Sequence, residues 1–281
     1  ALSTLLAEHG VLLFRGLPLE SAEDFDAFIQ AFHWPNFRYA DSLSNAVRSN
    51  RTERVFTANE APSAVEIFLH HEMAQTPIYP GKLFFFCEIA PDHGGETPLC
   101  RSDRLLALMR EKQPEFVERC AAEGLCYTNV MPREADAASG QGRSWSSTLG
   151  TSDRDEAAGK LASLGYSWSW LDSGDLKVTT PVLPALRMLP GGDEVFFNQL
   201  IAAYRGWNDN RNKGANSVSF GCGEEIAAAD MALTCELAEA ITENLAWQRG
   251  DVVLLDNYMM MHGRRPFSGS RAILASLLGA D

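Results

Sequence analysis

Two histidines and a glutamate in this sequence have the types and spacing of a metal-binding site. His70 and Glu72 stand two residues apart, and His262 follows much later in the chain. On extended backbone, alternate side chains lie on the same face, so His70 and Glu72 should point together and His71 should point away. Two imidazoles and one carboxylate on one side of a metal leave its other positions open, as Fe(II) oxygenases require. We therefore predict that His70, Glu72 and His262 bind one metal ion and that His71 does not.

This pattern also has a plainer interpretation. Most His-x-Glu triplets are ordinary surface or core-edge pairs, and a histidine near the end of a strand is often a structural residue. What favours the metal hypothesis is the rest of the sequence, in particular Arg271 and Thr97.

Arg271 and Thr97 are the residues that we expect to hold an organic acid beside the metal. Arg271 lies nine residues after His262 (271 − 262 = 9), at the start of the last apolar segment. A guanidinium forms a forked pair of hydrogen bonds with a carboxylate, so Arg271 suits the distal carboxylate of 2-oxoglutarate. Thr97 offers a hydroxyl to the same group, although its segment, 94–98, also has the composition of an ordinary turn after a strand.

Beyond these residues, the sequence resembles the taurine dioxygenase superfamily of Fe(II)/2-oxoglutarate oxygenases, and within it the clavaminate synthase-like branch. The resemblance extends over nearly the whole chain and rests on the order and spacing of several blocks. These blocks are residues 9–16, 55–60, 70–75, 82–88, 94–98, 197–199, 203–207, 250–257 and 262–265, followed by Arg271. One loop departs from the family, which usually has Gly-Asp-Gly where this chain has Gly221-Cys222-Gly223. An acidic role for that loop is therefore in doubt.

The resemblance implies a double-stranded β-helix, or jelly-roll, core with flanking and inserted helices. It implies Fe(II) bound by His70, Glu72 and His262, and 2-oxoglutarate bound by Arg271 and Thr97 as the cosubstrate of O2. The expected activity is oxidation, most simply hydroxylation, of an unactivated C–H bond with release of succinate and CO2. The alternatives are desaturation or cyclisation, or a protein that binds metal and oxoacid without turnover. Halogen transfer is not expected, because related halogenases have Gly or Ala in place of the carboxylate ligand.

Asn198 and Arg264 are the candidates for contacts with the substrate, because both are polar residues within the blocks that carry the resemblance. Arg265 is adjacent to Arg264, so at most one of the two should point inward; alternatively, both belong to a solvated charged surface. Relatives act on amino acids, sulfonates and peptide-like intermediates. We therefore expect a small, amino-acid-like or anionic substrate.

The elements that must position these residues alternate between strands and helices. Strands are predicted at 11–14, 82–89, 251–256 and 272–278, with shorter ones at 177–180 and 194–197. Helices are predicted at 22–32, 154–164 and 225–243, and across 105–124 with a break at Pro114. Segment 34–66 has the composition of a loop. This order indicates an α+β fold around a β-sandwich or barrel.

Length and composition are those of one globular domain covering residues 1–281. The 24 Lys and Arg against 37 Asp and Glu give a net charge of −13, which argues against general nucleic-acid binding. No apolar run approaches the roughly 20 residues of a membrane helix, and the first residues lack a signal-peptide pattern. The six cysteines have no metal-site or disulfide-scaffold spacing, so we expect reduced thiols and a cytoplasmic protein. The oligomeric state is not predicted.

Overall fold

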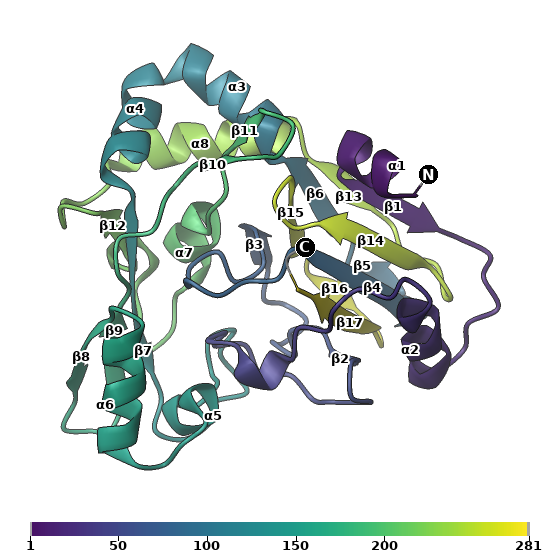
Figure 1. Cartoon of the computed structure of the whole chain (residues 1–281), viewed down its shortest axis with the longest axis horizontal. Coiled ribbons are helices and arrows are strands. Elements are labelled where there is room, and N and C mark those ends of the chain that lie inside the picture. The colour runs from purple at the N-terminus through teal and green to yellow at the C-terminus, as the bar shows by residue number, and fades with distance from the viewer. Residues whose placement is uncertain (1, 280–281) are drawn as a thin grey trace.

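The structure, a computed structural model, describes residues 2–279, and at its centre two antiparallel sheets lie face to face (Figure 1). The first sheet has the strand order β1 (Val11–Phe14), β14 (Val252–Asp256), β4 (Lys82–Ile89), β17 (Ala272–Leu278) and β2 (Phe56–Thr57). The second sheet has the order β13 (Glu243–Leu245), β6 (Thr97–Arg101), β15 (Met260–Arg264) and β3 (Ile67–His70). Each sheet thus pairs strands from the first half of the chain with strands from the second half.

Strand β4 shows why the two sheets enclose a core. Its residues alternate between two faces, as the period of a strand requires. Leu83, Phe85 and Cys87 point toward the second sheet and pack in one cluster with Met260 of β15. Phe84 and Phe86 point the other way, with Phe25 stacked on the Phe86 ring at 5.2 Å between centroids. The predicted bounds of this strand, 82–89, and of the strands at 11–14 and 272–278 are confirmed.

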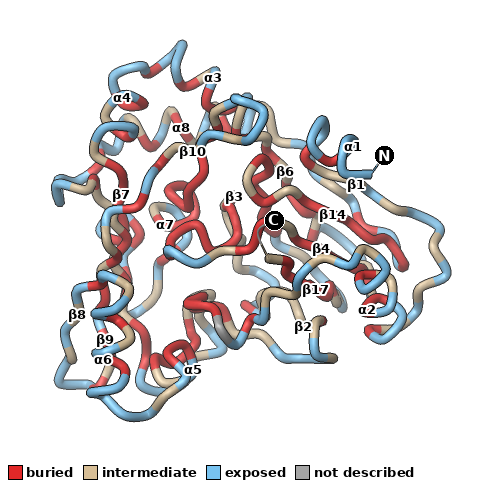
Figure 2. Tube along the Cα trace, in the orientation of Figure 1, coloured by how far each residue is buried: buried red, intermediate tan, exposed pale blue. Residues whose placement is uncertain are grey.

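Helices α1 (Leu2–His9) and α2 (Ala22–Gln30) cover the outer face of the first sheet (Figure 2). Helix α2 begins at the predicted residue 22, after a capping box. The Ser21 hydroxyl accepts a hydrogen bond from the Asp24 backbone N–H, and the Asp24 carboxylate accepts one from the Ser21 N–H. The helix ends at Gln30, two residues before the predicted end at 32.

Four helices cover the outer face of the second sheet: α3 (Ser102–Lys112), α4 (Pro114–Glu123), α7 (Leu200–Gly206) and α8 (Ala228–Ala240). The predicted break at Pro114 is confirmed, because this proline begins α4, where its missing N–H costs nothing. The predicted helix at 225–243 is too long at both ends. Helix α8 ends at Ala240, and Glu243 already belongs to β13.

A third sheet stands apart from the sandwich and has the order β12 (Val218–Phe220), β7 (Leu125–Met131), β9 (Leu176–Thr179) and β8 (Ser167–Trp170). Helices α5 (Trp145–Leu149) and α6 (Arg154–Ser163) share a core with it. The remaining elements are short: β5 (His93–Gly94) with β16 (Phe267–Ser268), β10 (Arg187–Met188) with β11 (Glu194–Val195), and the 3-10 turns η1 (Tyr39–Asp41) and η2 (Gly214–Asn216). The α+β prediction is confirmed as a mixture of helix and antiparallel sheet.

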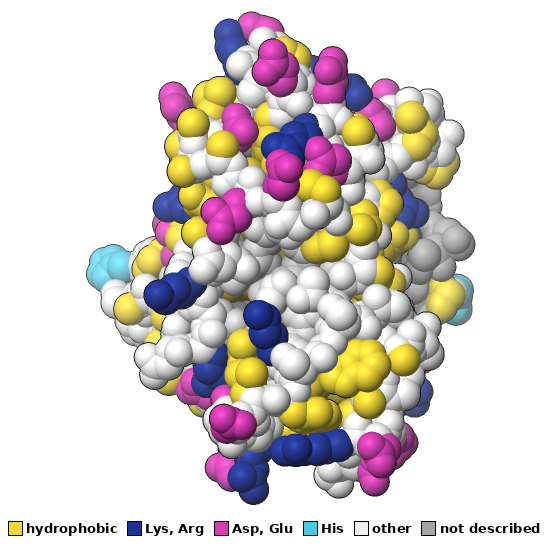
Figure 3. Space-filling model, turned by 90° about the vertical axis from the view of Figure 1, so that its left-hand side faces the viewer, with side chains coloured by type: hydrophobic (Ala, Val, Ile, Leu, Met, Phe, Trp, Pro, Cys, Tyr) yellow, Lys and Arg dark blue, Asp and Glu magenta, His cyan; other side chains and the backbone are white. Residues whose placement is uncertain are grey.

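The surface and the cysteines agree with the composition. On the face drawn in Figure 3, acidic and basic side chains are interspersed, and the basic ones form no continuous band. All six cysteines are free thiols. Within residues 2–279, no helix has the length and apolar character needed to cross a membrane.

Candidate metal and oxoacid site

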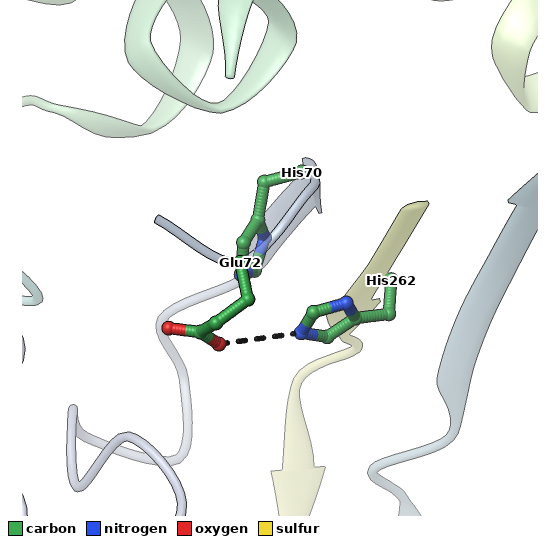
Figure 4. Close-up of side chains that lie close together, drawn as sticks. All are labelled: His70, Glu72 and His262. Carbon is green, nitrogen blue, oxygen red and sulfur yellow. Dashed lines mark ion pairs between the residues drawn. The ribbon is translucent and has the colours of Figure 1, made fainter. Parts of the chain in front are cut away.

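His70 and His262 meet because the strands that carry them are paired. In the antiparallel pair β3 and β15, His70 stands directly opposite His262, and their ring centroids are 4.4 Å apart. Side chains directly opposite each other across such a pair are close neighbours. Glu72 reaches the same place, with its Oε2 3.6 Å from Nε2 of His262 (Figure 4). Donor atoms of the three residues lie within 4.8 Å of one another, the only such trio among the described residues.

The backbone around Glu72 differs from the extended conformation that we predicted. Strand β3 ends at His70, and Glu72 lies in a turn that contains Met73 at a φ of 61°. Asn257 holds this turn from the end of β14. Its Oδ1 accepts a hydrogen bond from the Glu72 N–H (2.7 Å), and its Nδ2 donates to the Glu72 carbonyl (3.0 Å). The Glu72 side chain therefore lies beside His70 because Asn257 holds the turn between them. The alternation of side chains along a strand does not place it there.

His71 lies outside this group, as predicted. Its side chain is buried, with Nε2 hydrogen-bonded to the Ser102 hydroxyl (2.6 Å) and Nδ1 hydrogen-bonded to the Asn257 carbonyl. Both ring nitrogens therefore have protein partners, and the residue ties β3 to α3 and to the Asn257 turn.

The electrostatics of the three candidate ligands suit a metal ion. Burial, followed by the neighbouring His262, lowers the pKa of His70 from 6.5 to about 4, so the imidazole is neutral at physiological pH. Nδ1 of His70 is hydrogen-bonded to the Phe68 carbonyl (2.8 Å), which leaves Nε2 for a metal. Burial would raise the pKa of Glu72, but Arg48 and the two histidines outweigh it and hold this pKa well below its usual range. The donor set thus offers imidazole nitrogens and an ionised oxygen, which fits Fe(II).

Stability of the metal-free protein should fall as the pH drops from about 6.5 toward about 3. Burial lowers the pKa of His71 from 6.5 to about 3, so the unfolded chain binds a proton that the folded chain excludes. The stabilisation is complete above pH 6.5 and is lost progressively below it; His70 acts in the same direction. Urea denaturation at a series of pH values measures this slope. His71→Gln should flatten it, and an unchanged slope in that variant would contradict the assignment.

Arg271 and Thr97 both line the cavity that contains the three candidate ligands. Arg271 is partly buried, and within the described residues its only hydrogen bond runs from Nε to the Gly95 carbonyl (3.1 Å). Burial, followed by the charge of Arg264, lowers its pKa to about 10, and no described carboxylate pairs with it. Thr97 is buried and accepts a hydrogen bond from Nε1 of Trp247 (3.0 Å). It begins strand β6, so the interpretation of its segment as a simple turn is wrong.

Gly95 makes room for the Arg271 side chain. Its φ is +68°, and a Cβ atom there would lie 3.1 Å from Cδ of Arg271 and 2.9 Å from Cγ of Pro91. A larger residue would therefore push against the arginine that we expect to bind the oxoacid.

The two substrate candidates have different surroundings. Arg264 lines the cavity, but its guanidinium donates to four backbone carbonyls of segment 59–65, at 2.7 to 3.3 Å. Arg265 points outward to Glu66 and Glu239, so only one arginine of the pair faces inward, as predicted. Asn198 does not line the cavity. Its Nδ2 donates to the Ala185 carbonyl (3.0 Å) and its Oδ1 accepts from the Leu200 N–H (2.9 Å), so we leave it out of the proposed substrate site.

Phe85 lines the cavity and Cys222 does not. Phe85 is the one ring of the three in β4 that faces the cavity, 5.3 Å from the His262 ring, while Phe84 and Phe86 are plain core. Cys222 is exposed and hydrogen-bonds to Glu123 (2.7 Å), and it does not line the cavity. The departure of its loop from the family pattern thus leaves the site unaffected.

Sequence reasoning missed two polar residues of the site, Arg48 and Asn257. Arg48 lines the cavity and donates from Nη2 to both carboxylate oxygens of Glu72, at 3.0 and 3.1 Å. It lies in segment 34–66, which was interpreted as loop and offered no pattern to single it out. Asn257 follows directly after an apolar strand, and that position was the available signal for a residue that orders the turn.

Comparison with known proteins gives one family and several relatives. The model described as "Taurine catabolism dioxygenase TauD, TfdA family" matches residues 1–278. A clavaminate synthase-like protein of Arabidopsis thaliana is 41% identical over 278 residues, covering 98% of this chain and 83% of its own. The dapdiamide synthesis protein DdaC of Enterobacter agglomerans is 28% identical over 288 residues, with the same coverage. Among solved structures, PvcB of Pseudomonas aeruginosa shares the fold at a TM-score of 0.58, with 13% identity, covering 100% of this chain and 79% of its own.

Proposed function

The chain belongs to the TauD/TfdA family of dioxygenases, and on this premise we propose that it oxidises, most simply by hydroxylation, an unactivated C–H bond of a small, anionic or amino-acid-like molecule. It is an Fe(II)- and 2-oxoglutarate-dependent dioxygenase, with O2 as oxidant. Succinate and CO2 are the coproducts of the reaction that we propose. Residues 1–281 act as a single catalytic domain, and the two facing sheets form a double-stranded β-helix.

The observation that carries this proposal is the meeting of two unlike features in one cavity. Two imidazoles and a carboxylate converge there, and Arg271, a partly buried arginine without a described counter-charge, lines the same space. A site for metal alone has no use for such an arginine. A dicarboxylic oxoacid needs both, because one end chelates the metal and the other end needs a cation.

Each residue has a defined task in the proposed reaction. His70, Glu72 and His262 hold Fe(II), which when bound with 2-oxoglutarate supplies the oxidising power that no side chain has. Arg271 and Thr97 bind the distal carboxylate of the oxoacid and fix its orientation. Phe85 lies against His262 and excludes water from that side of the metal.

Two alternatives concern the outcome and not the site. A desaturase or cyclase would use the same residues, because it begins with the same removal of a hydrogen atom from carbon. A protein that binds metal and oxoacid without turnover would also have the same side chains. The names of two relatives favour an enzyme. One is called a clavaminate synthase-like protein, and the other, DdaC, is called a dapdiamide synthesis protein.

An assay of succinate release tests the proposal. The purified protein, with Fe(II), 2-oxoglutarate and O2, should form succinate slowly by itself and faster with members of a library of small acids and amino acids. Product masses then separate addition of one oxygen from loss of two hydrogens. The His262→Ala variant is the control, since it should release none. Tight binding of metal and 2-oxoglutarate without succinate release under any of these conditions would favour the binding protein.

A further inference from the structure

Arg48 is a buried guanidinium with hydrogen-bonding capacity that the protein leaves unused. Its side chain is 7% exposed and lies beside the rings of Tyr39 and Phe56, at 4.7 and 5.4 Å from their centroids. Nη2 donates to the Glu72 carboxylate, whereas Nε and Nη1 are buried without any described hydrogen-bond partner. Buried N–H groups of a charged side chain are costly to leave unpaired, so a ligand that satisfies them would be bound strongly.

Arg48 is one of three arginines that line the cavity, and each of the other two has another role. The Arg264 guanidinium donates hydrogen bonds to four backbone carbonyls. Arg271 has the place and the free charge for the distal carboxylate of 2-oxoglutarate. Arg48 therefore remains for a second anion.

The charge balance next to Glu72 points the same way. Without metal, Arg48 and Glu72 neutralise each other at 3.0 Å. Once Glu72 also binds a divalent cation, its single negative charge is shared between two cations, and Arg48 is left with excess positive charge. A singly charged oxyanion restores the balance, whereas a dianion such as phosphate would be repelled by the nearby Glu72 carboxylate.

We propose that Arg48 binds a singly charged oxyanion of the substrate, a carboxylate or a sulfonate, and so determines which molecules the enzyme accepts. This inference rests on the proposed function, because it places the substrate beside the metal that Glu72 binds. Asn45, Gln75 and Gln141 line the same cavity, and each has a buried side-chain oxygen without a described donor. These oxygens offer acceptors to N–H groups elsewhere on the substrate.

Binding of matched probes to the Mn(II)- and 2-oxoglutarate-loaded protein, without O2, tests the inference. The probes are the L-amino acids and ω-amino sulfonates, each titrated calorimetrically beside its neutral carboxamide or sulfonamide. At least one acid should bind the natural protein, and its neutral amide should not. Arg48→Gln should weaken binding of that acid by at least about 30-fold, and Arg48→Lys should restore part of it because the charge returns.

Controls separate recognition of the anion from support of Glu72 and from loss of folding. Each variant is first saturated with Mn(II) and 2-oxoglutarate at concentrations set by its own dissociation constants. Arg143 provides the matched control: it lies over the same Tyr39 ring at 5.1 Å but donates to the carbonyls of Ser42, Ser44 and Ser147 and does not line the cavity. Folded Arg143→Gln should bind the acid as the natural protein does.

The outcomes are distinct. Equal binding of acid and amide, binding of no acid at all, or full binding of the acid by the saturated Arg48→Gln protein would each overturn the role of Arg48. Failure of the natural protein to bind 2-oxoglutarate would instead overturn the proposed function. Because 2-oxoglutarate is titrated first in the same experiment, the two failures cannot be confused.

Discussion

Replacing His262 with alanine should reduce the affinity for Mn(II) or Fe(II) by more than about 100-fold, since even the indirect partners of metal ligands typically contribute 10- to 100-fold. His70→Ala should have the same effect. The two rings stand opposite each other in the β3–β15 pair, 4.4 Å apart between centroids, and no other described histidine reaches Glu72. Calorimetric titration of the metal-free protein under anaerobic conditions measures the loss.

His71→Ala is the matched control, because it removes an adjacent imidazole that has a different environment. Its ring is buried against Ser102 and Asn257, so the substitution should lower the free energy of unfolding by about 1–3 kcal/mol through two lost hydrogen bonds. Its metal affinity should stay close to that of the natural protein at a temperature where the variant is folded. Loss of metal binding in folded His71→Ala, with retention in His262→Ala, would refute the ligand assignment.

Replacing Arg271 with alanine should weaken 2-oxoglutarate binding by at least about 100-fold. Removing one partner of a buried charge pair typically costs about 3–5 kcal/mol, and each 1.4 kcal/mol is a factor of ten. Arg271 has no described carboxylate partner, so no described anion competes for its charge, and Gly95 leaves space for its side chain. Titration of 2-oxoglutarate into the Mn(II)-loaded variant measures the change.

Two further variants make this result specific. Thr97→Val should weaken 2-oxoglutarate binding less than Arg271→Ala does, because Thr97→Val removes one neutral hydroxyl and leaves the arginine charge in place. Arg265→Ala removes a guanidinium that points outward to Glu66 and Glu239, so the affinity for 2-oxoglutarate should not change. An unchanged dissociation constant in Arg271→Ala would place the oxoacid anchor elsewhere, and Arg48 would be the next residue to substitute.

The sequence by itself determined much of the sheet framework, because apolar strands bounded by turn residues have a strong local pattern. The strands at 82–89 and 272–278 have the predicted bounds, and the predicted helix start at 22 and the break at Pro114 are confirmed. The residue types of the candidate metal site could also be identified from the sequence, because a His-x-Glu pair and a distant histidine can be recognised without the structure. The alternative interpretation of Thr97, as part of an ordinary turn, failed because Thr97 begins β6, and cross-strand pairing rather than composition makes that segment a strand.

Only the tertiary structure decided how the site is assembled and which polar residues face it. Glu72 joins His70 through a turn clamped by Asn257, a contact between residues 185 positions apart that no local pattern encodes. Asn198 and Arg264 both looked available for a substrate, but backbone groups, including carbonyls of other segments, occupy their side chains. Arg48 came from a segment without periodicity, and only the packing of β2 and the Tyr39 turn brings it to Glu72. Side-chain hydrogen bonds between distant segments depend on the folded path of the whole chain. The sequence could therefore indicate the chemistry of the site but not the hydrogen-bond partners of its polar side chains.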